Sequence, residues 1–234
     1  MPSDAPLILA FDTSAAHCAA ALMSGDTLLA TDKGDMARGQ AEHLMPMLQT
    51  MLKTQQRDWT DIDLIAVGVG PGNFTGIRIS VAAARGLALG LGIPTMAVST
   101  FEVMRGPTSP HDKAPQLVSI KGSRDSLYLQ LFGGGHPSGP PRQVDFSANV
   151  PDCIITPETL ILGHRVGDLA QRLDGPIAPE QLVEREMADF GPTLARIALA
   201  RWRQGETTPP PPAPLYVRAA DAAPARDAPP VLLD

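Results

Sequence analysis

Two short segments carry residue types that could hold a phosphate group or a metal ion. Asp12-Thr13-Ser14 ends a strand-like run, where a carboxylate beside two hydroxyls could bind a metal-bound phosphate or cap the local turn. The loop from Gly70 to Gly76 lies between a strand-like and a helix-like run, and amides at a helix start can cradle an anion. Its spacing matches neither a P-loop nor the dinucleotide fingerprint, so a ligand site and a tight structural turn are both open interpretations.

Other catalytic chemistry finds no support in the sequence. The five histidines are scattered, with no H-E-x-x-H motif, and no G-x-S-x-G elbow is present. His17 beside Cys18 is interpreted as a packing pair rather than a metal site. We therefore assign no catalytic residue and no metal ligand.

Composition narrows the class of protein. The chain has 234 residues, a net charge of −6 and only 4% aromatic residues, which argues against a free-standing nucleic-acid binder. Two cysteines cannot form a disulfide framework, and the first residues lack the basic region of a signal peptide, so we expect a reduced, cytoplasmic setting. The longest apolar stretch, Gly86 to Val98, is too short to span a membrane, so no membrane partner is expected.

The elements that must position the two segments alternate between strands and helices. A strand at 7–14 and a hairpin over 18–31 come first, followed by a helix at 38–53, which Pro46 kinks or divides. A buried strand at 63–69, a helix at 77–91 and a strand at 95–98 complete this half. The second half echoes the pattern weakly, with strands at 116–120, 126–132, 143–146 and 160–163 and helices at 166–173 and 192–203. This order predicts an α/β layer architecture.

A Pro/Gly-rich bridge, Gly106 to Pro110, suggests how the chain divides. We expect an N-terminal lobe at 1–105, a smaller C-terminal lobe at 106–208 and a Pro-rich tail at 209–234, extended or disordered. Leu215-Tyr216-Val217-Arg218 is the one strand-like stretch in this tail and could dock on the folded body.

Apolar stripes on two helices of the first half are the candidate partner surface. The first stripe runs along 41–52, and the second helix is apolar nearly all round, as expected of a helix buried in its own protein or against a partner. Arg78 and Arg85 lie on one flank of the second helix. They could form a solvated edge or a charged rim around a protein–protein contact. We predict a partner interface formed by Leu44, Leu48, Met51, Ile77, Arg78, Val81, Ala84 and Arg85. On this prediction Val81→Glu abolishes pairing and leaves the monomer folded.

Three segments resemble the TsaB (YeaZ) family of the bacterial tRNA threonylcarbamoyladenosine machinery. They are Leu9-Ala10-Phe11-Asp12-Thr13-Ser14, Glu42-His43-Leu44-Met45-Pro46 and the string Gly70-Pro71-Gly72-Asn73-Phe74-Thr75-Gly76-Ile77-Arg78. The resemblance is close over about 7–104 and weak beyond. Asn73 replaces a usual serine, and Lys121 stands where an acid is common in the second lobe, which weakens a nucleotide or metal site there.

The resemblance implies a two-lobed, actin-like and sugar-kinase-like (ribonuclease H-like) fold with a reduced second lobe. It implies a non-catalytic accessory subunit that binds and activates a TsaD-like catalytic subunit in threonylcarbamoylation of N6 of adenosine 37 in tRNAs reading ANN codons. A TsaE-like ATPase is a further expected partner, and tRNA is contacted mainly through the complex. ATP, Mg and a metal are expected in the partner subunits, with no cofactor bound by this chain alone. A vestigial phosphate loop would comprise Asp12, Thr13, Ser14, Gly70, Gly72, Thr75 and Gly76.

Two other hypotheses remain open. The chain could be an enzyme in its own right, either glycoprotease- or peptidase-like or an ATP-binding enzyme of the same superfamily. It could also form a homodimer through the same apolar stripes when its partner is missing.

Overall fold

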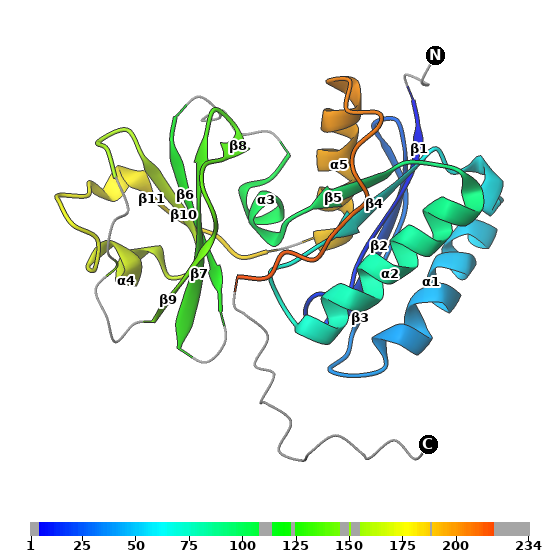
Figure 1. Ribbon diagram of the computed structural model, residues 1–234, viewed down its shortest axis with the longest axis horizontal. Coiled ribbons are helices and arrows are strands. Elements are labelled where there is room, and N and C mark those ends of the chain that lie inside the picture. Colours follow the sequence, from blue (N-terminus) through cyan, green and yellow to red (C-terminus); the bar gives the residue numbers. More distant parts are fainter. Residues whose placement is uncertain are drawn as a thin grey trace, which may run out of the picture.

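The computed structural model describes residues 5–107, 114–122, 125–145, 150, 155–187 and 189–217 (Figure 1). Two lobes lie side by side, each built on its own β-sheet. The chain crosses between the lobes at the end of the first half and returns before the last helix (Figure 1).

The first lobe is a five-stranded sheet in the order β3-β2-β1-β4-β5. Strand β1 pairs antiparallel with β2 and parallel with β4, and β5 continues the parallel side. The strands are β1 (Leu7–Asp12), β2 (His17–Ser24), β3 (Thr27–Asp35), β4 (Leu64–Gly68) and β5 (Thr95–Val98). Both faces of β1 are buried, which explains its unbroken apolar run.

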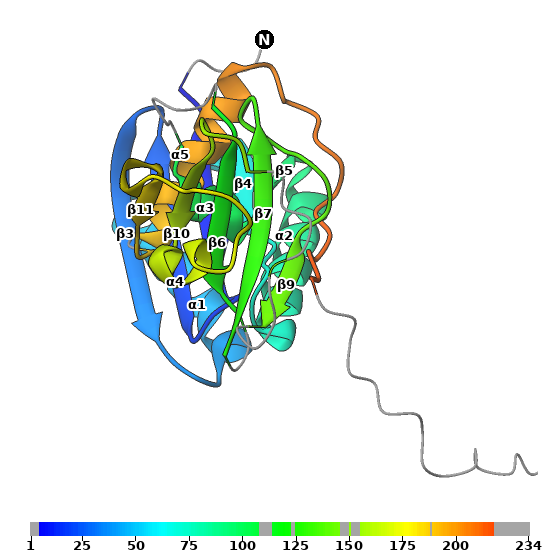
Figure 2. The same cartoon turned by 90° about the vertical axis from the view of Figure 1, so that its left-hand side faces the viewer.

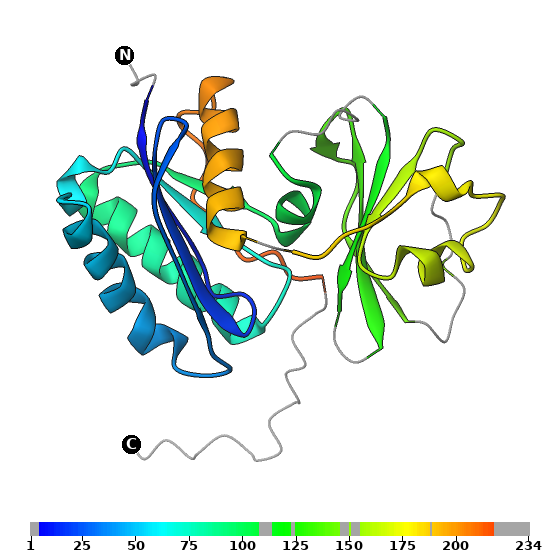
Figure 3. The ribbon, with the colours of Figure 1, turned by 180° about the vertical axis from the view of Figure 1, so that it is seen from behind.

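Helices cover both faces of this sheet. Helices α1 (Gln40–Thr54) and α2 (Phe74–Leu91) pack on one face, and α5 (Phe190–Arg203) packs on the other (Figure 3). A short 3₁₀ turn, η1 (Trp59–Asp61), links α1 to β4. The structure places α5 in the first lobe, whereas the sequence-based division assigned it to the second. The reason is that the apolar side of α5 covers a sheet face that neither α1 nor α2 reaches.

The second lobe repeats the topology of the first. In the second sheet, β6 pairs antiparallel with β7 and parallel with β10, β9 pairs antiparallel with β7, and β11 extends the parallel side. The order β9-β7-β6-β10-β11 therefore reproduces β3-β2-β1-β4-β5, which confirms the expected α/β, actin-like fold. Figure 2 looks onto this sheet. Its elements are β6 (Gln116–Lys121), β7 (Ser126–Gly133), β8 (His136–Pro137), β9 (Arg142–Asp145), β10 (Leu160–Gly163), β11 (Leu182–Glu184), α4 (Val166–Ala170) and η2 (Pro179–Gln181).

Among the described residues, helix α3 (Thr100–Arg105) and the segment after α5 pack against both lobes. Helix α3 buries Phe101 and Met104 against the second sheet. Residues 207–217, here called the strap, run from the end of α5 down past the parallel edge of the first sheet (orange to red, Figures 1 and 2). Leu215 of the strap packs against apolar clusters of both lobes and donates its amide to Val69 O at 2.8 Å. The docking expected for Leu215 to Val217 is therefore confirmed, and Arg218 lies outside the described residues.

Several elements differ in extent from their sequence-based prediction. Helix α1 runs through Pro46 as one element, with the proline on the exposed side. Helix α2 begins at Phe74, inside the segment predicted as a loop, because Asn73 caps it by accepting a hydrogen bond from Gly76 N at 3.0 Å. By length and hydropathy α2 could cross a membrane, yet it packs on β4 and 28% of it is buried within the fold.

Candidate functional site

The two segments singled out as a phosphate loop meet in the structure. The end of β1 and the loop between β4 and α2 press together so closely that only glycine fits at three positions. A Cβ on Gly68 would lie 1.9 Å from Asp12 Oδ2, one on Gly72 would lie 2.2 Å from Ser14 O, and one on Gly76 would lie 1.8 Å from Thr13 O. Gly72 and Gly76 therefore allow two backbone segments to approach closely, and Gly68 leaves room for the Asp12 side chain.

Asp12, Thr13 and Ser14 are sealed by this contact. Asp12 and Thr13 have no exposed surface and Ser14 has 2%. Asp12 Oδ1 accepts from Ser14 N at 2.8 Å and Ser14 Oγ at 2.9 Å, and His17 Nε2 lies 3.0 Å from it. Oδ2 has no hydrogen-bond partner among the described residues, but it lies against the Gly68 backbone.

This geometry does not fit a bound nucleotide or a metal-bound phosphate. Thr13 Oγ1 donates to Gly76 O at 2.6 Å, so the hydroxyl that would face a phosphate holds the loop shut instead. Of the predicted loop residues, Asp12, Thr13, Ser14, Gly72 and Gly76 form this contact, here called the joint. Gly70 lies against Ile77, and Thr75 is exposed. The structural-turn interpretation, left open by the sequence, accounts for these contacts.

His17 and Cys18 lie in the core, as the packing interpretation expected. The His17 ring is 5.2 Å from the Phe190 ring of α5 and is 8% exposed. Burial, followed by the nearby Asp12 charge, raises the pKa of the Cys18 thiol to about 11. A thiol so far from ionisation is a packing group rather than a nucleophile. Cys153 lies outside the described residues.

The apolar stripes predicted as a partner interface are part of the protein's own core. The helices lie flat on the first sheet, and their apolar sides face Leu9, Phe11 and Val67 of its strands. Six of the eight predicted interface residues are at most 5% exposed: Leu44, Leu48, Met51, Ile77, Val81 and Ala84. The prediction was wrong because helical periodicity marks the side that a helix buries first, which here is the side against its own sheet.

The exposed side of α2 has a different composition. Arg78, Ala82, Arg85, Gly86 and Leu89 recur at helical spacing and are all exposed, and Leu89 is 87% exposed. We call these five residues the α2 outer face. A Cβ on Gly86 would meet nothing within 4 Å. The helix contains no acidic residue, so both charges on this face are positive. Of the predicted interface, only Arg78 and Arg85 belong to it.

A stacked cluster lies where the α2 outer face meets the strap. The guanidinium of Arg78 lies 3.8 Å from the ring centroid of Phe74 and donates from Nε to Tyr216 Oη at 2.9 Å. The rings of Phe74 and Tyr216 are 5.0 Å apart and about two fifths exposed. The cluster joins a helix and a tail residue 138 positions later in the sequence.

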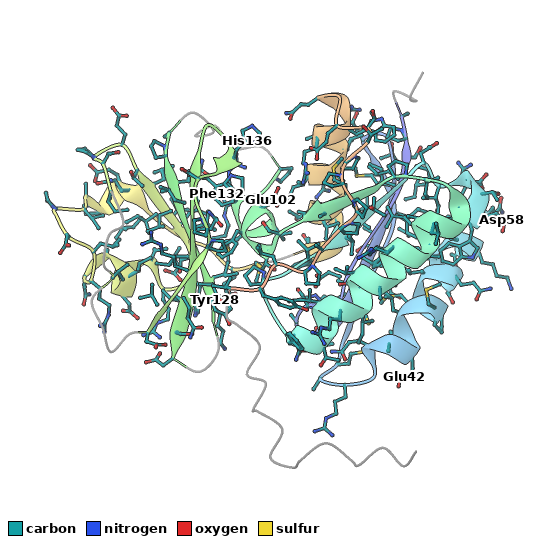
Figure 4. All side chains as sticks on the ribbon, in the orientation of Figure 1. Glu42, Asp58, Glu102, Tyr128, Phe132 and His136 are labelled. Carbon is teal, nitrogen blue, oxygen red and sulfur yellow. The ribbon has the colours of Figure 1, made fainter. Side chains whose placement is uncertain are left out.

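The lobes also enclose a pocket of about 860 Å³. Figure 4 shows Glu102 of α3 and His136 of β8, which line this pocket between the lobes. The same view shows Glu42 near the start of α1 and Asp58 beyond its end, both far from the pocket. Charged side chains that line the pocket form ion pairs with one another. Arg201 donates to Glu206 at 2.7 Å and also lies 3.4 Å from Glu102. Glu206 has a lowered pKa because Arg201 donates a hydrogen bond to it. The contact with Glu102 links the end of α5 to the first turn of α3, and the pair with Glu206 holds the chain that follows α5.

The turn after β6 in the second lobe is where the sequence was expected to depart from the family pattern, and the structure describes part of it. Lys121 ends β6 with its side chain exposed, and residues 123 and 124 lie outside the described part of the chain. Asp125 forms an ion pair with Arg165 at 2.6 Å, so the acid near this turn is engaged by the protein itself.

Sequence signals were available for two features that the prediction missed. Ser99 and Glu102 cap α3 reciprocally, and a Ser followed three residues later by Glu announces a helix start. The outer face was visible as the side of α2 that carries Ala82, Gly86 and both arginines while Ile77 and Val81 occupy the other.

Part of the chain is similar in sequence to known proteins. Residues 34–136, less than half of the chain, match the model of the family TsaD: tRNA N6-adenosine threonylcarbamoyltransferase. The tRNA threonylcarbamoyladenosine biosynthesis protein TsaB of Escherichia coli K12 is 41% identical over 97 residues, which are 42% of this chain and 42% of that protein. TsaB of Bacillus subtilis is 36% identical over 97 residues, again 42% of each chain. The matched stretch thus spans less than half the length of these relatives.

Solved structures extend the likeness across both lobes. YeaZ from Pseudomonas aeruginosa has a TM-score of 0.65 at 25% identity, covering 86% of this chain and 94% of that chain. A second Pseudomonas aeruginosa structure, described as similar to the peptidase YEAZ, has a TM-score of 0.69 at 24% identity and covers 91% of this chain and all of that one. The second lobe therefore shares its fold with these structures.

Proposed function

Since its first half is homologous to TsaB proteins and its fold is that of YeaZ, we propose that this chain is a non-catalytic accessory subunit that binds and activates a TsaD-like catalytic subunit. The complex would threonylcarbamoylate N6 of adenosine 37 in tRNAs reading ANN codons. A TsaE-like ATPase would complete it, and tRNA would be held mainly by the partners, since this chain carries a net charge of −6. ATP, Mg and a metal would reside in those partners, and the setting would be the cytoplasm.

The α2 outer face carries this proposal. Leu89 is 87% exposed on this face, beside small residues and two arginines, and apolar surface rimmed by polar residues is typical of a protein-interaction site. The small residues Ala82 and Gly86 allow the backbone of a second helix to approach closely. Burying Leu89 in such a contact would contribute about 1.5–3 kcal/mol.

A TsaD-like occupant suits this face. The TsaD family model matches residues 34–136, a range that includes α1 and α2, so members of that family share sequence features with these helices. Two chains that present related helix pairs can pack face to face about a pseudo-twofold axis, as in an isologous dimer. The same geometry would allow this chain to pair with itself when the partner is absent.

The joint between β1 and the glycine loop supports the proposal that this chain has no enzymatic role. Asp12, Thr13 and Ser14 are the residues nearest to a catalytic or phosphate-binding set, and their hydrogen bonds serve the fold. We therefore assign the chemistry of the complex to the partner, and to this chain the task of stabilising it.

The experiment measures binding of the purified chain to the TsaD-like subunit of the same organism by calorimetry and size-exclusion chromatography. Ala82→Glu and Leu89→Asp place charge on the outer face, and each should weaken binding at least about tenfold. Leu28→Asp is the matched control, because Leu28 is also exposed but lies on β3. A wild-type chain that fails to bind would refute the proposed function, whereas unchanged binding by both outer-face variants would refute only this assignment of the surface.

A further inference from the structure

The Phe74–Arg78–Tyr216 cluster holds an arginine in one orientation on an exposed surface. The Arg78 plane stacks on Phe74 at 3.8 Å, and its Nε is engaged by the Tyr216 hydroxyl at 2.9 Å. Stacking and a hydrogen bond together remove most of the rotamer freedom that an exposed arginine normally has. The side chain is therefore ordered before any ligand arrives.

The outer edge of this guanidinium is free. Among the described residues, neither Nη atom of Arg78 has a hydrogen-bond partner. These two nitrogens present the pair of parallel N–H donors that a carboxylate accepts in bidentate fashion. An arginine that is positioned by the fold and left unpaired is suited to recognise an anion.

Arg78 also begins the α2 outer face. Ala82, Gly86 and Leu89 follow it at helical spacing. Arg85 is seven residues after Arg78, which places it about 10.5 Å along the helix axis at 1.5 Å per residue. The cluster is thus continuous with the surface proposed to bind the partner.

The strap fixes the third member of the cluster. Leu215 donates its amide to Val69 O at 2.8 Å and packs on both lobes, and Val217 packs on the second lobe. Tyr216 lies between these two anchors, so its position depends on the closed arrangement of both lobes. The strap therefore connects the relative position of the lobes to the orientation of Arg78.

We propose that this cluster is a specificity site that takes an Asp or Glu side chain of the partner subunit, with Arg78 as the contact residue and Tyr216 as its positioning residue. The inference rests on the proposed function and assigns a role to the strap. The carboxylate would accept two N–H donors from Arg78 while Leu89 and the small residues bury the adjoining apolar surface.

A carboxylate of a protein fits this surface better than a phosphate of tRNA. The outer face offers two arginines, whereas nucleic-acid binding draws on broad basic fields, and the chain as a whole is acidic at −6. Ala82, Gly86 and Leu89 would be left uncovered by an RNA backbone but buried by a helix.

The test is a double-mutant cycle on binding of the full chain to the TsaD-like subunit. Arg78→Gln should raise the dissociation constant about tenfold or more and make binding less dependent on salt. Tyr216→Phe keeps the ring and removes only the hydroxyl, and should raise the constant about threefold to fivefold. In the Arg78→Gln background, Tyr216→Phe should have no further effect, because its role is to orient that side chain.

Arg196→Gln serves as the charge-matched control, since Arg196 is exposed on α5, which covers the opposite face of the first sheet. Thermal unfolding of each variant verifies that the fold is retained. If the wild type binds while Arg78→Gln and Tyr216→Phe bind equally well, this inference fails and the proposed function stands. Additive effects of the two substitutions would exclude the positioning role. A loss of tRNA affinity in the assembled complex, with unchanged affinity between the subunits, would overturn the carboxylate in favour of phosphate.

Discussion

Thr13 and Gly76 are in direct backbone contact across the first lobe. The Thr13 hydroxyl donates to Gly76 O at 2.6 Å, and a Cβ on Gly76 would lie 1.8 Å from Thr13 O. Gly76 lies in the first turn of α2, so this contact determines where the helix begins relative to β1. The placement of the α2 outer face therefore depends on a joint at the opposite side of the same helix.

Gly76→Ala should destabilise the protein by about 3 kcal/mol or more, because neither backbone segment can move away without breaking the joint. Gly86→Ala is the matched control in the same helix, where a Cβ meets nothing within 4 Å. It should instead stabilise by about 0.5–1 kcal/mol through the higher helix propensity of alanine. Urea unfolding of both variants measures the difference. Equal stabilities would show that the tight contact is absent in solution.

Val81→Glu and Ala82→Glu should behave in opposite ways although they are neighbours. Val81 is 5% exposed where α2 packs on the sheet, so a charge there should lower the free energy of unfolding by about 3–5 kcal/mol. We therefore expect Val81→Glu to unfold the protein, in place of the folded but unpaired monomer expected from the sequence. Ala82 is exposed, and its substitution should change stability by less than about 0.5 kcal/mol. Circular dichroism melts distinguish the two. A folded Val81→Glu chain would contradict the assignment of this side to the core.

The isolated chain should not bind Mg-ATP with micromolar affinity, because Asp12 and Thr13 are fully buried and the Thr13 hydroxyl and Asp12 Oδ1 are engaged in hydrogen bonds within the protein. Calorimetry at a protein concentration of about 100 μM would detect a dissociation constant in that range. A micromolar constant that Asp12→Ala removes would revive the hypothesis that this chain is an ATP-binding enzyme.

The Arg201–Glu206 pair should make stability depend on acidity. The folded-state pKa of Glu206 is lowered from 4.5, because Arg201 donates a hydrogen bond to it. Its contribution is therefore present above about pH 4.5 and is lost as pH falls through the folded-state value. Glu206→Gln should cost about 0.5–1 kcal/mol at pH 7, and the difference from the wild type should shrink in acid.

Urea unfolding at several pH values measures this difference. Glu158→Gln is the control, because it removes an exposed carboxylate for which the described structure has no ion pair. A difference that grows as pH falls would show that the pair does not stabilise the folded state through the ionised Glu206 carboxylate.

The elements of the first lobe were largely readable from the sequence because each is dictated by local pattern. Continuous apolar runs predicted β1 and β4, and period-3.6 stripes predicted α1 and α2, since burial against one sheet imposes those periods. The repeat of the first topology in the second lobe was only weakly visible. Strand pairing requires hydrogen bonds and alternation, which quite different residues satisfy, so no residue-level repeat is needed.

The sequence by itself determined the α/β class, the likeness to TsaB and the presence of two apolar helices, because these follow from composition, periodicity and a specific glycine string. Only the tertiary structure decided which side of each helix is free and whether the glycine loop is open. Periodicity reports that a side is buried without saying by what, and here the first sheet covers Val81 while Ala82 remains outside. The meeting of Arg78 with Tyr216 likewise depends on long-range folding, because it brings together residues 138 positions apart.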